Sequence, residues 1–259
     1  MKLNVACGGR YHDEWVNVDF HADSSHVRKV NILSGLPFDD STFDVVYSSH
    51  FLEHLSIEQE RLLMNEVLRV LKPGGIFRVV VPDLEDICRE YLNVLGEFDS
   101  GKAVDKKHEW IVAELIDQLV RVDSGGQMGK LFNDIDLADY ILMRTGDVIP
   151  VRKADTRRVI TFDKLKNKFI YLYLKFIRFL IPKNLRDLVF VNTSIGERHQ
   201  WMYDRYSMTK MLRNEGFSGV HIEEFNTSRI EEFNKYNLDT KADGTPYKGQ
   251  SSLYVEAVK

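Results

Sequence analysis

Short apolar runs, each ended by a turn signal, recur through the first 83 residues of the chain. Five of these runs predict β-strands, and the fifth is almost wholly β-branched or aromatic, as expected of a strand buried on both faces. The predicted strands cover residues 3–6, 15–19, 27–33, 43–47 and 76–81.

A helix is predicted between the fourth and fifth strands. Leu63, Val67 and Val70 recur at helical spacing. Ser56 followed by Gln59 is the pattern of a capping box, and residues 72–75 (KPGG) are predicted to end the helix. Because parallel strands need such helical connections, the pattern predicts an α/β fold with a mostly parallel sheet.

The same pattern returns at the C-terminal end of the chain. A predicted helix, 206–215, precedes two strands, 220–225 and 253–258, which are expected to pair antiparallel because no helical segment separates them. The stretch between the two parts differs in character and contains a predicted helix over 109–122. We therefore predict a core formed by residues 1–83 and 201–259. Residues 84–200 are predicted to form a largely helical insertion above the sheet.

Composition narrows the class of protein. The 259 residues are 44% hydrophobic and 29% charged, which fits a soluble globular protein and excludes an extended disordered chain. The net charge of −4 argues against a nucleic-acid partner. Two cysteines give no disulfide framework and favour the cytoplasm. Neither a signal peptide nor a membrane-spanning run of about 18 apolar residues is expected.

A glycine turn follows the first predicted strand, where α/β folds approach nucleotide-like cofactors. Ala6, Gly8 and Gly9 carry little or no side chain, so ligand atoms can contact the backbone there, and Asp19 ends the second strand. The alternative is a tight turn without a ligand. Asp19 lies 11 residues after Gly8, whereas the dinucleotide pattern places its acid about 20 residues on, so NAD is disfavoured.

Four segments in order resemble the motifs of class I S-adenosylmethionine (SAM)-dependent methyltransferases, in particular the branch called type 11. Residues 3–9 (LNVACGG) resemble the glycine motif, and residues 15–19 (WVNVD) the ribose-binding strand. Residues 36–46 resemble the segment leading into the fourth strand, and residues 66–75 the helix and turn before the fifth. The resemblance implies a Rossmann-like methyltransferase sandwich whose last strand is antiparallel.

The resemblance also implies a cofactor site. Ala6, Gly8 and Gly9 would face the methionine part of SAM, and Asp19 would accept hydrogen bonds from the ribose hydroxyls. Asn31 and Ile32 would hold adenine, with the Asn31 amide oxygen accepting from the exocyclic amine. Ser49 and His50, at the end of the fourth strand, would lie beside the sulfonium and its methyl group.

The function implied by the resemblance is methyl transfer from SAM to a small-molecule or glycan-like acceptor. Relatives are associated with modification of cell-surface polysaccharides. Two alternatives stay open: a SAM-binding interaction protein without catalysis, and a metal-dependent enzyme built on residues 50–54 (HFLEH).

Residues 50–54 allow three interpretations. On a helix, His50, Glu53 and His54 would share one face, and these side chains are good ligands for a divalent metal. Alternatively they form the pocket floor without a metal, which is the interpretation we favour, or one acts as a general base.

After His50, His199 is the second candidate for catalysis. It precedes Trp201 and Tyr203 just before the predicted return to the sheet, and imidazole is a suitable base near neutral pH. The alternative is that the two aromatic residues belong to the core and His199 to a surface turn. His108 is a weaker candidate of the same kind.

Residues 163–187 form a basic amphipathic segment. Seven basic and two acidic residues give it a net charge of +5, and Lys164, Lys168, Lys175 and Arg178 lie on one helical stripe beside bulky apolar residues. Such a helix can lie on an anionic membrane surface. Packing on the core or on a second copy in a homodimer is the alternative. We expect a cytoplasmic protein, either free or peripheral at the inner membrane face.

Overall fold

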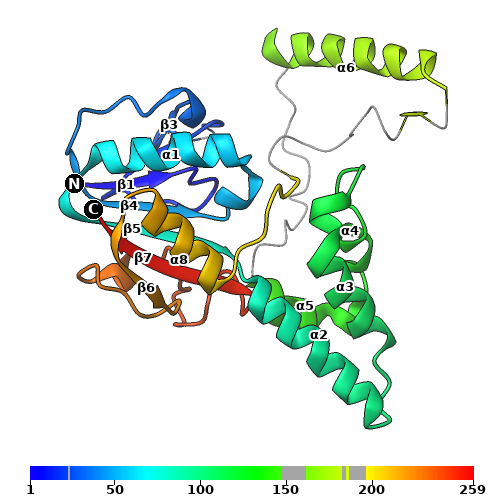
Figure 1. Cartoon of the computed structure of the whole chain (residues 1–259). Coiled ribbons are helices and arrows are strands. Elements are labelled where there is room, and N and C mark those ends of the chain that lie inside the picture. Colours follow the sequence, from blue (N-terminus) through cyan, green and yellow to red (C-terminus); the bar gives the residue numbers. More distant parts are fainter. Residues whose placement is uncertain (23, 147–161, 183–184, 187–196) are drawn as a thin grey trace.

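The computed structural model describes residues 1–22, 24–146, 162–182, 185–186 and 197–259, with residues 162–168, 170 and 171 described in their backbone only. Its centre is a seven-stranded sheet with the order β3-β2-β1-β4-β5-β7-β6 (Figure 1). The strands are β1 (Lys2–Val5), β2 (Val16–Asp19), β3 (Val27–Lys29), β4 (Phe43–Ser49), β5 (Leu71–Pro82), β6 (Ser218–Glu223) and β7 (Ser252–Val258).

The pairing of the strands confirms the predicted fold class. β1 to β5 pair with one another in parallel, and β7 runs antiparallel to both β5 and β6. The third strand is shorter than predicted and the fifth is longer. The helix before β5 ends at Val70, so residues 72–75 lie within the irregular start of β5, where its register with β4 shifts.

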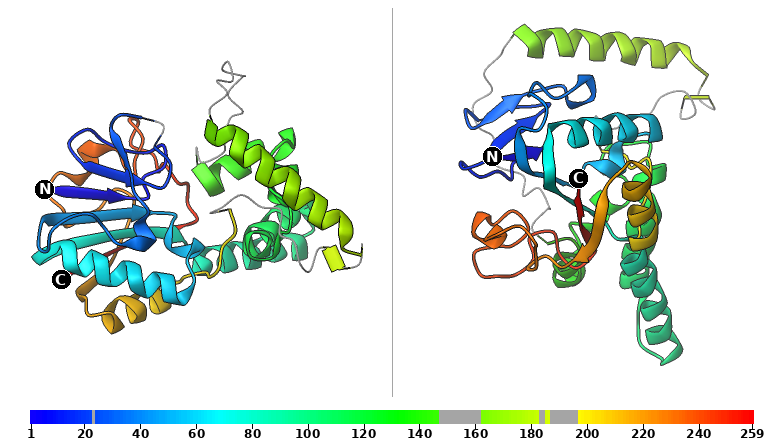
Figure 2. Two further views of the ribbon diagram at one scale, coloured as in Figure 1. Left: turned by 90° about the horizontal axis from the view of Figure 1, so that it is seen from above. Right: turned by 60° about the vertical axis from the view of Figure 1, so that its left-hand side comes forward.

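Each face of the sheet is covered differently. Helices α1 (Ile57–Val70) and α8 (Arg205–Asn214) bury apolar side chains such as Leu63 and Met208 against one face. The opposite face is covered by the loop before β7, which includes the 3₁₀ helix η5 (Phe233–Tyr236) and buries Phe233 and Leu238 (Figure 2, right). The predicted capping box of α1 is present.

Residues 84–146 are helical and add no strand to the sheet. They form α2 (Leu84–Asp99), α3 (Asp105–Val120), α4 (Met128–Leu131), the 3₁₀ helix η3 (Ile135–Leu137) and α5 (Ala138–Thr145). Arg144 fixes this part to the core. Its buried guanidinium pairs with Glu114 and Asp86, and its carbonyl oxygen accepts from the Ser251 hydroxyl at 2.7 Å. The insertion thus meets the chain directly before β7.

Helix α6 (Phe162–Leu180) lies apart from the sheet and from α2–α5 (Figures 1 and 2). Most of its described apolar side chains are exposed, Phe169 by 75% and Phe179 by 73%. Within the part of the chain described here, no helix combines the length and hydrophobicity needed to cross a bilayer.

Candidate active site

The glycine turn leaves the carboxyl end of β1 as predicted. Ala6 and Gly8 both adopt left-handed backbone conformations, with φ of 55° and 52°. A Cβ atom placed on Gly8 or Gly9 would meet no atom within 4 Å. The space above this turn is therefore open to a ligand, and a side chain at Gly8 would both strain the backbone and project into that space.

Asp19 is joined directly to the glycine turn. One carboxylate oxygen accepts from the Gly8 amide at 2.8 Å, and the other accepts from the His21 amide at 2.9 Å. A carboxylate has about four lone-pair sites, so acceptor capacity remains for hydroxyl groups. The contact between Asp19 and Gly8 is a role that the sequence did not reveal.

Asn31 and Ile32 follow β3 at the same edge of the sheet. The Val30 amide donates to the Asp19 carbonyl at 2.8 Å, which holds this segment beside the end of β2. The Asn31 side-chain nitrogen donates to the Ser34 hydroxyl at 2.7 Å, so its amide oxygen keeps its acceptor capacity. Ile32 is buried in the core.

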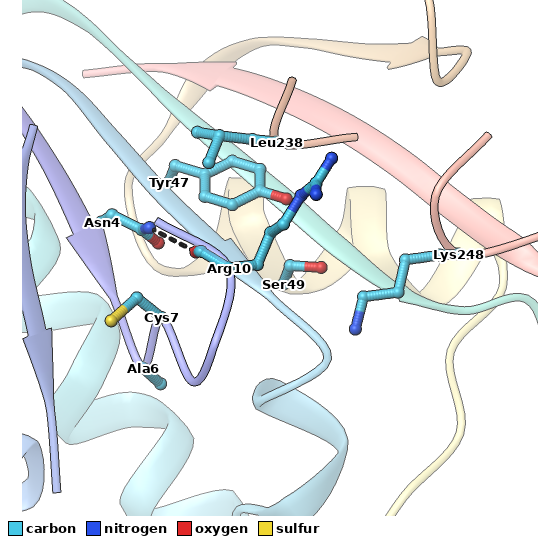
Figure 3. Close-up of a pocket in the computed structure, with 8 residues that line it drawn as sticks. All are labelled: Asn4, Ala6, Cys7, Arg10, Tyr47, Ser49, Leu238 and Lys248. Atoms are coloured by element: carbon cyan, nitrogen blue, oxygen red, sulfur yellow. Dashed lines mark hydrogen bonds between the residues drawn. The ribbon is translucent and has the colours of Figure 1, made fainter. Parts of the chain in front are cut away.

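A small cavity of about 30 Å³ lies beneath the glycine turn, enough for about one water molecule (Figure 3). Ala6 and Ser49, two of the residues predicted to contact the cofactor, are among the residues that line it. The sequence did not single out its other lining residues: Asn4, Cys7, Arg10, Tyr47, Leu238 and Lys248. A cofactor the size of SAM therefore has to lie over the strand ends and not inside this cavity.

Two cations adjoin the cavity. The Arg10 guanidinium donates to the Thr240 carbonyl at 2.7 Å and stacks 4.1 Å from the Tyr247 ring centre. Burial lowers the pKa of Lys248, while Glu53 and Asp239 act in the opposite direction. No motif pointed to these residues because both depend on the loop before β7, more than two hundred residues from the glycine turn.

The helix on which the metal hypothesis for His50, Glu53 and His54 depended is not formed. His50 has φ of 51°, and only a single 3₁₀ turn, η2 (Leu52–His54), follows before Ser56 caps α1. The chain must turn within a few residues from the end of β4 into α1, which leaves no room for an α-helix. His50 instead hydrogen-bonds to the Ser252 hydroxyl at 3.0 Å.

Glu53 is the unusual member of this segment. Its side chain is 1% exposed, and neither carboxylate oxygen has a hydrogen-bond partner. The nearest charged-group contacts are His50 Nδ1 at 3.6 Å and His54 Nε2 at 3.8 Å. Burial raises the pKa of Glu53 to about 8, although the Lys248 charge acts in the opposite direction.

His199 lies next to His54 although the two residues are far apart in the sequence. It is buried, so the surface-turn interpretation is wrong, and its ring lies 4.8 Å from the His54 ring, centre to centre. Trp201 is exposed and Tyr203 is buried, so only Tyr203 belongs to the core. His108 packs against the Tyr91 ring instead.

The histidines near this site are neutral at neutral pH. Burial lowers the pKa of His50 well below its usual value and lowers the pKa of His54. Burial also lowers the pKa of His199 to about 3, with His54 and Arg121 acting in the same direction. A neutral imidazole can accept a proton or bind a metal, although a low pKa weakens it as a base.

The segment that runs from β1 into β5 matches a known protein family. Residues 4–79 match the family described as "Methyltransferase domain". This match confirms the predicted resemblance to class I methyltransferases, and SAM is the cofactor of that class, as predicted.

Individual relatives match short segments of the chain. A probable methyltransferase, ltbC, of Aspergillus luteorubrus is 47% identical over 47 residues, which are 18% of this chain and 16% of that protein. An uncharacterized protein of Haemophilus influenzae is 39% identical over 51 residues, 20% of each chain. The chain therefore matches about a fifth or less of the length of these curated relatives.

Two solved structures are similar over the whole chain at low identity. A SAM-dependent methyltransferase from Archaeoglobus fulgidus is 14% identical, with a TM-score of 0.40, and the match covers 100% of this chain and 85% of that one. One from Mesorhizobium loti is 15% identical, with a TM-score of 0.38 and coverage of 100% and 90%.

Proposed function

We propose that the protein transfers a methyl group from SAM to a small-molecule or glycan-like acceptor. The order of residues along one sheet edge carries this proposal. The ends of β3, β2, β1 and β4 present Asn31, Asp19, Gly8 and Ser49 in turn. In SAM the sulfonium joins the ribose to the methionine chain, so adenine, ribose and methionine follow one another as Asn31, Asp19 and Gly8 do, over two strand spacings or roughly 10 Å.

The chemistry asked of the protein is mainly positioning. Methyl transfer needs the acceptor atom, the methyl carbon and the sulfur in line, and SAM supplies the reactive methyl group when it is bound. His50 and His199 are our candidates to orient the acceptor or take its proton. Because burial lowers the pKa of both, we assign the larger share of the rate enhancement to alignment. We propose that the protein is cytoplasmic. We also propose that its reaction contributes to the modification of cell-surface polysaccharide.

The first prediction separates this cofactor from a dinucleotide. Calorimetry of the full chain is expected to give one site for SAM and for S-adenosylhomocysteine, and none for NAD, because the short connection between β1 and β2 leaves Asp19 close to Gly8. Mass spectrometry of saccharide and small-molecule acceptors incubated with SAM then tests transfer. Binding of NAD in place of SAM would contradict the cofactor assignment. Tight SAM binding without transfer to any acceptor would favour the non-catalytic alternative.

We also propose that α6 brings the enzyme to an anionic membrane surface, where a lipid-linked acceptor would be found. The exposed apolar side chains of its second half support this proposal, as does the segment's net charge of +5. Large exposed apolar patches usually belong to a contact surface. The side chains of Lys164 and Lys168 lie outside the described residues, so the proposed basic stripe rests in part on sequence alone.

The second prediction concerns this attachment. Each basic residue near an anionic surface contributes about 1 kcal/mol, so four on one stripe give roughly 4 kcal/mol, which is enough for reversible binding. The protein should sediment with vesicles containing anionic lipid at low salt, and should be released by salt or by charge reversal at Lys175 and Arg178 together. Vesicles of neutral lipid are the control. Protein that stays in the supernatant and scatters light as a dimer would assign α6 to a homodimer interface.

A further inference from the structure

We infer that Glu53, His54 and His199 form a binding site for one divalent transition-metal ion. Each of the three residues offers one ligand atom, and these atoms all lie within 4.8 Å of one another. One carboxylate and two imidazoles are a ligand set that suits Zn²⁺ and its neighbours in the first transition row. This inference goes beyond methyl transfer and does not depend on it.

The unpartnered carboxylate of Glu53 is the strongest support. A buried carboxylate without a hydrogen bond or a close cation is costly, and native proteins pair such groups or bind a metal with them. Both oxygens of Glu53 lack a hydrogen-bond partner although the side chain is almost fully buried. A metal ion would replace the proton on this carboxyl group and give it the partner that it lacks.

Neighbouring groups orient the two imidazole ligands. His54 Nδ1 lies 2.9 Å from the Arg198 carbonyl oxygen, to which it donates, so its lone pair is at Nε2, the nitrogen that faces Glu53. The side-chain amide nitrogen of Gln118 donates to His199 Nε2 at 2.8 Å, so His199 binds a metal through Nδ1 only after the Gln118 amide turns and its oxygen accepts from Nε2. Metal-binding histidines commonly donate the other ring N–H to a carbonyl or carboxylate oxygen, as His54 does here.

Little movement is needed to bring the ligands together. Tetrahedral Zn²⁺ with bonds of about 2.0–2.1 Å separates its ligand atoms by about 3.4 Å. The Glu53 oxygen and His54 Nε2 are already 3.8 Å apart. Three protein ligands leave a fourth position for water or for an oxygen of the acceptor, as in catalytic zinc sites.

The backbone holds this cluster in place from three parts of the chain. The Glu53 carbonyl accepts from the Gln200 amide at 2.6 Å, and the Gln118 carbonyl accepts from the His199 amide at 3.0 Å. The site therefore exists only when the segment after β4, helix α3 and residues 198–200 come together. This explains why the sequence hypothesis chose His50, which Ser252 holds, in place of His199.

Two cationic side chains, Arg121 and Lys248, adjoin the cluster. Arg121 is paired with Asp117 at 2.6 Å and with Glu197 at 3.2 Å, so its charge is compensated. Lys248 would compete with a metal ion for Glu53, because its charge lowers the pKa of that carboxyl group. If no metal binds, the Lys248 ammonium is the group left to compensate Glu53.

The test measures metal binding without SAM or any acceptor. The full chain is stripped with a chelator and titrated with Co²⁺, followed by visible absorption and equilibrium dialysis. We expect one equivalent bound, and at least a tenfold lower affinity in each of E53Q, H54Q and H199Q. His26→Gln removes an exposed histidine elsewhere and should bind Co²⁺ like the unchanged chain. A chain that binds no more Co²⁺ than E53Q, or histidine variants that bind as the unchanged chain does, would overturn the site.

Thermal unfolding provides a second measurement that does not depend on variant yield. Saturating Zn²⁺ at about a hundred times its Kd should raise the Tm of the unchanged chain by about 5 °C, and should leave that of E53Q unchanged. Without metal, E53Q should be at least as stable as the unchanged chain, because an amide replaces an unpartnered buried carboxyl group. Equal Zn²⁺-induced shifts in both proteins would place the ion elsewhere.

Discussion

Asp19→Ala is expected to lower the affinity for SAM about ten- to a hundredfold. Hydrogen bonds to a charged group contribute roughly 1.5–3 kcal/mol, and the substitution removes the carboxylate proposed to accept from both ribose hydroxyls. It also removes the acceptor of the Gly8 amide, so part of the loss could come through the glycine turn. Calorimetry with S-adenosylhomocysteine measures the total loss.

A second ligand separates these two causes. An analogue that lacks both ribose hydroxyls should bind the unchanged chain about ten- to a hundredfold more weakly than S-adenosylhomocysteine, and Asp19→Ala should reduce this ratio to near one. Equal losses for both ligands would mean that Asp19 acts only on the turn. Glu14→Ala is the matched control, since it removes an exposed carboxylate from the same connection between β1 and β2. Its affinity should be unchanged.

The sequence predicted the parts of this fold that depend on neighbouring residues. The strands, the capping box of α1 and the turn at Gly8 follow from short patterns, so all seven strands were located. The ends of parallel strands meet at one edge, so Gly8, Asp19 and Asn31 could also be placed together from sequence. Their contacts with a cofactor remain predictions.

The rest depends on contacts between distant segments. No local pattern shows that His199 reaches His54, or that Lys248 lines the cavity next to Ala6. The helical arrangement required by the metal alternative for residues 50–54 does not form, because the short path from β4 into α1 overrides helical spacing. Burial of Glu53 without a partner is likewise visible only in three dimensions.

Arg78 in β5 is a further feature that no motif indicated. Its guanidinium is fully buried and lies 2.7 Å from Asp239 and 2.7 Å from Glu256. The carbonyls of Thr227 and Glu224 accept two more of its N–H groups. Since Asp239 also accepts from the Tyr47 hydroxyl, this network fixes the loop before β7 against the strand whose Tyr47 lines the cavity.

Arg78→Met is therefore expected to destabilise the protein by about 3–5 kcal/mol, because it leaves two buried carboxylates without their cation. Urea unfolding at neutral pH measures the loss. Arg89→Met is the matched control: Arg89 is 72% exposed and pairs with Glu85, so this variant should lose far less stability than Arg78→Met. An equally small loss at Arg78 would mean that the buried network contributes no more than a surface ion pair.

The pH dependence of this variant follows from the same network. Burial raises the pKa of Asp239, while the Arg78 charge acts in the opposite direction. Without Arg78 the folded-state pKa of Asp239 rises further above its unfolded value. A carboxyl group of this kind disfavours folding only where the unfolded chain would ionise it, above about pH 4. The loss of stability in Arg78→Met should therefore be largest at neutral pH and shrink toward pH 4.

Adding Asp239→Asn and Glu256→Gln should recover much of this loss at neutral pH. A loss of stability that persists after both changes would be assigned to packing of the Arg78 side chain against Phe233 and Tyr254.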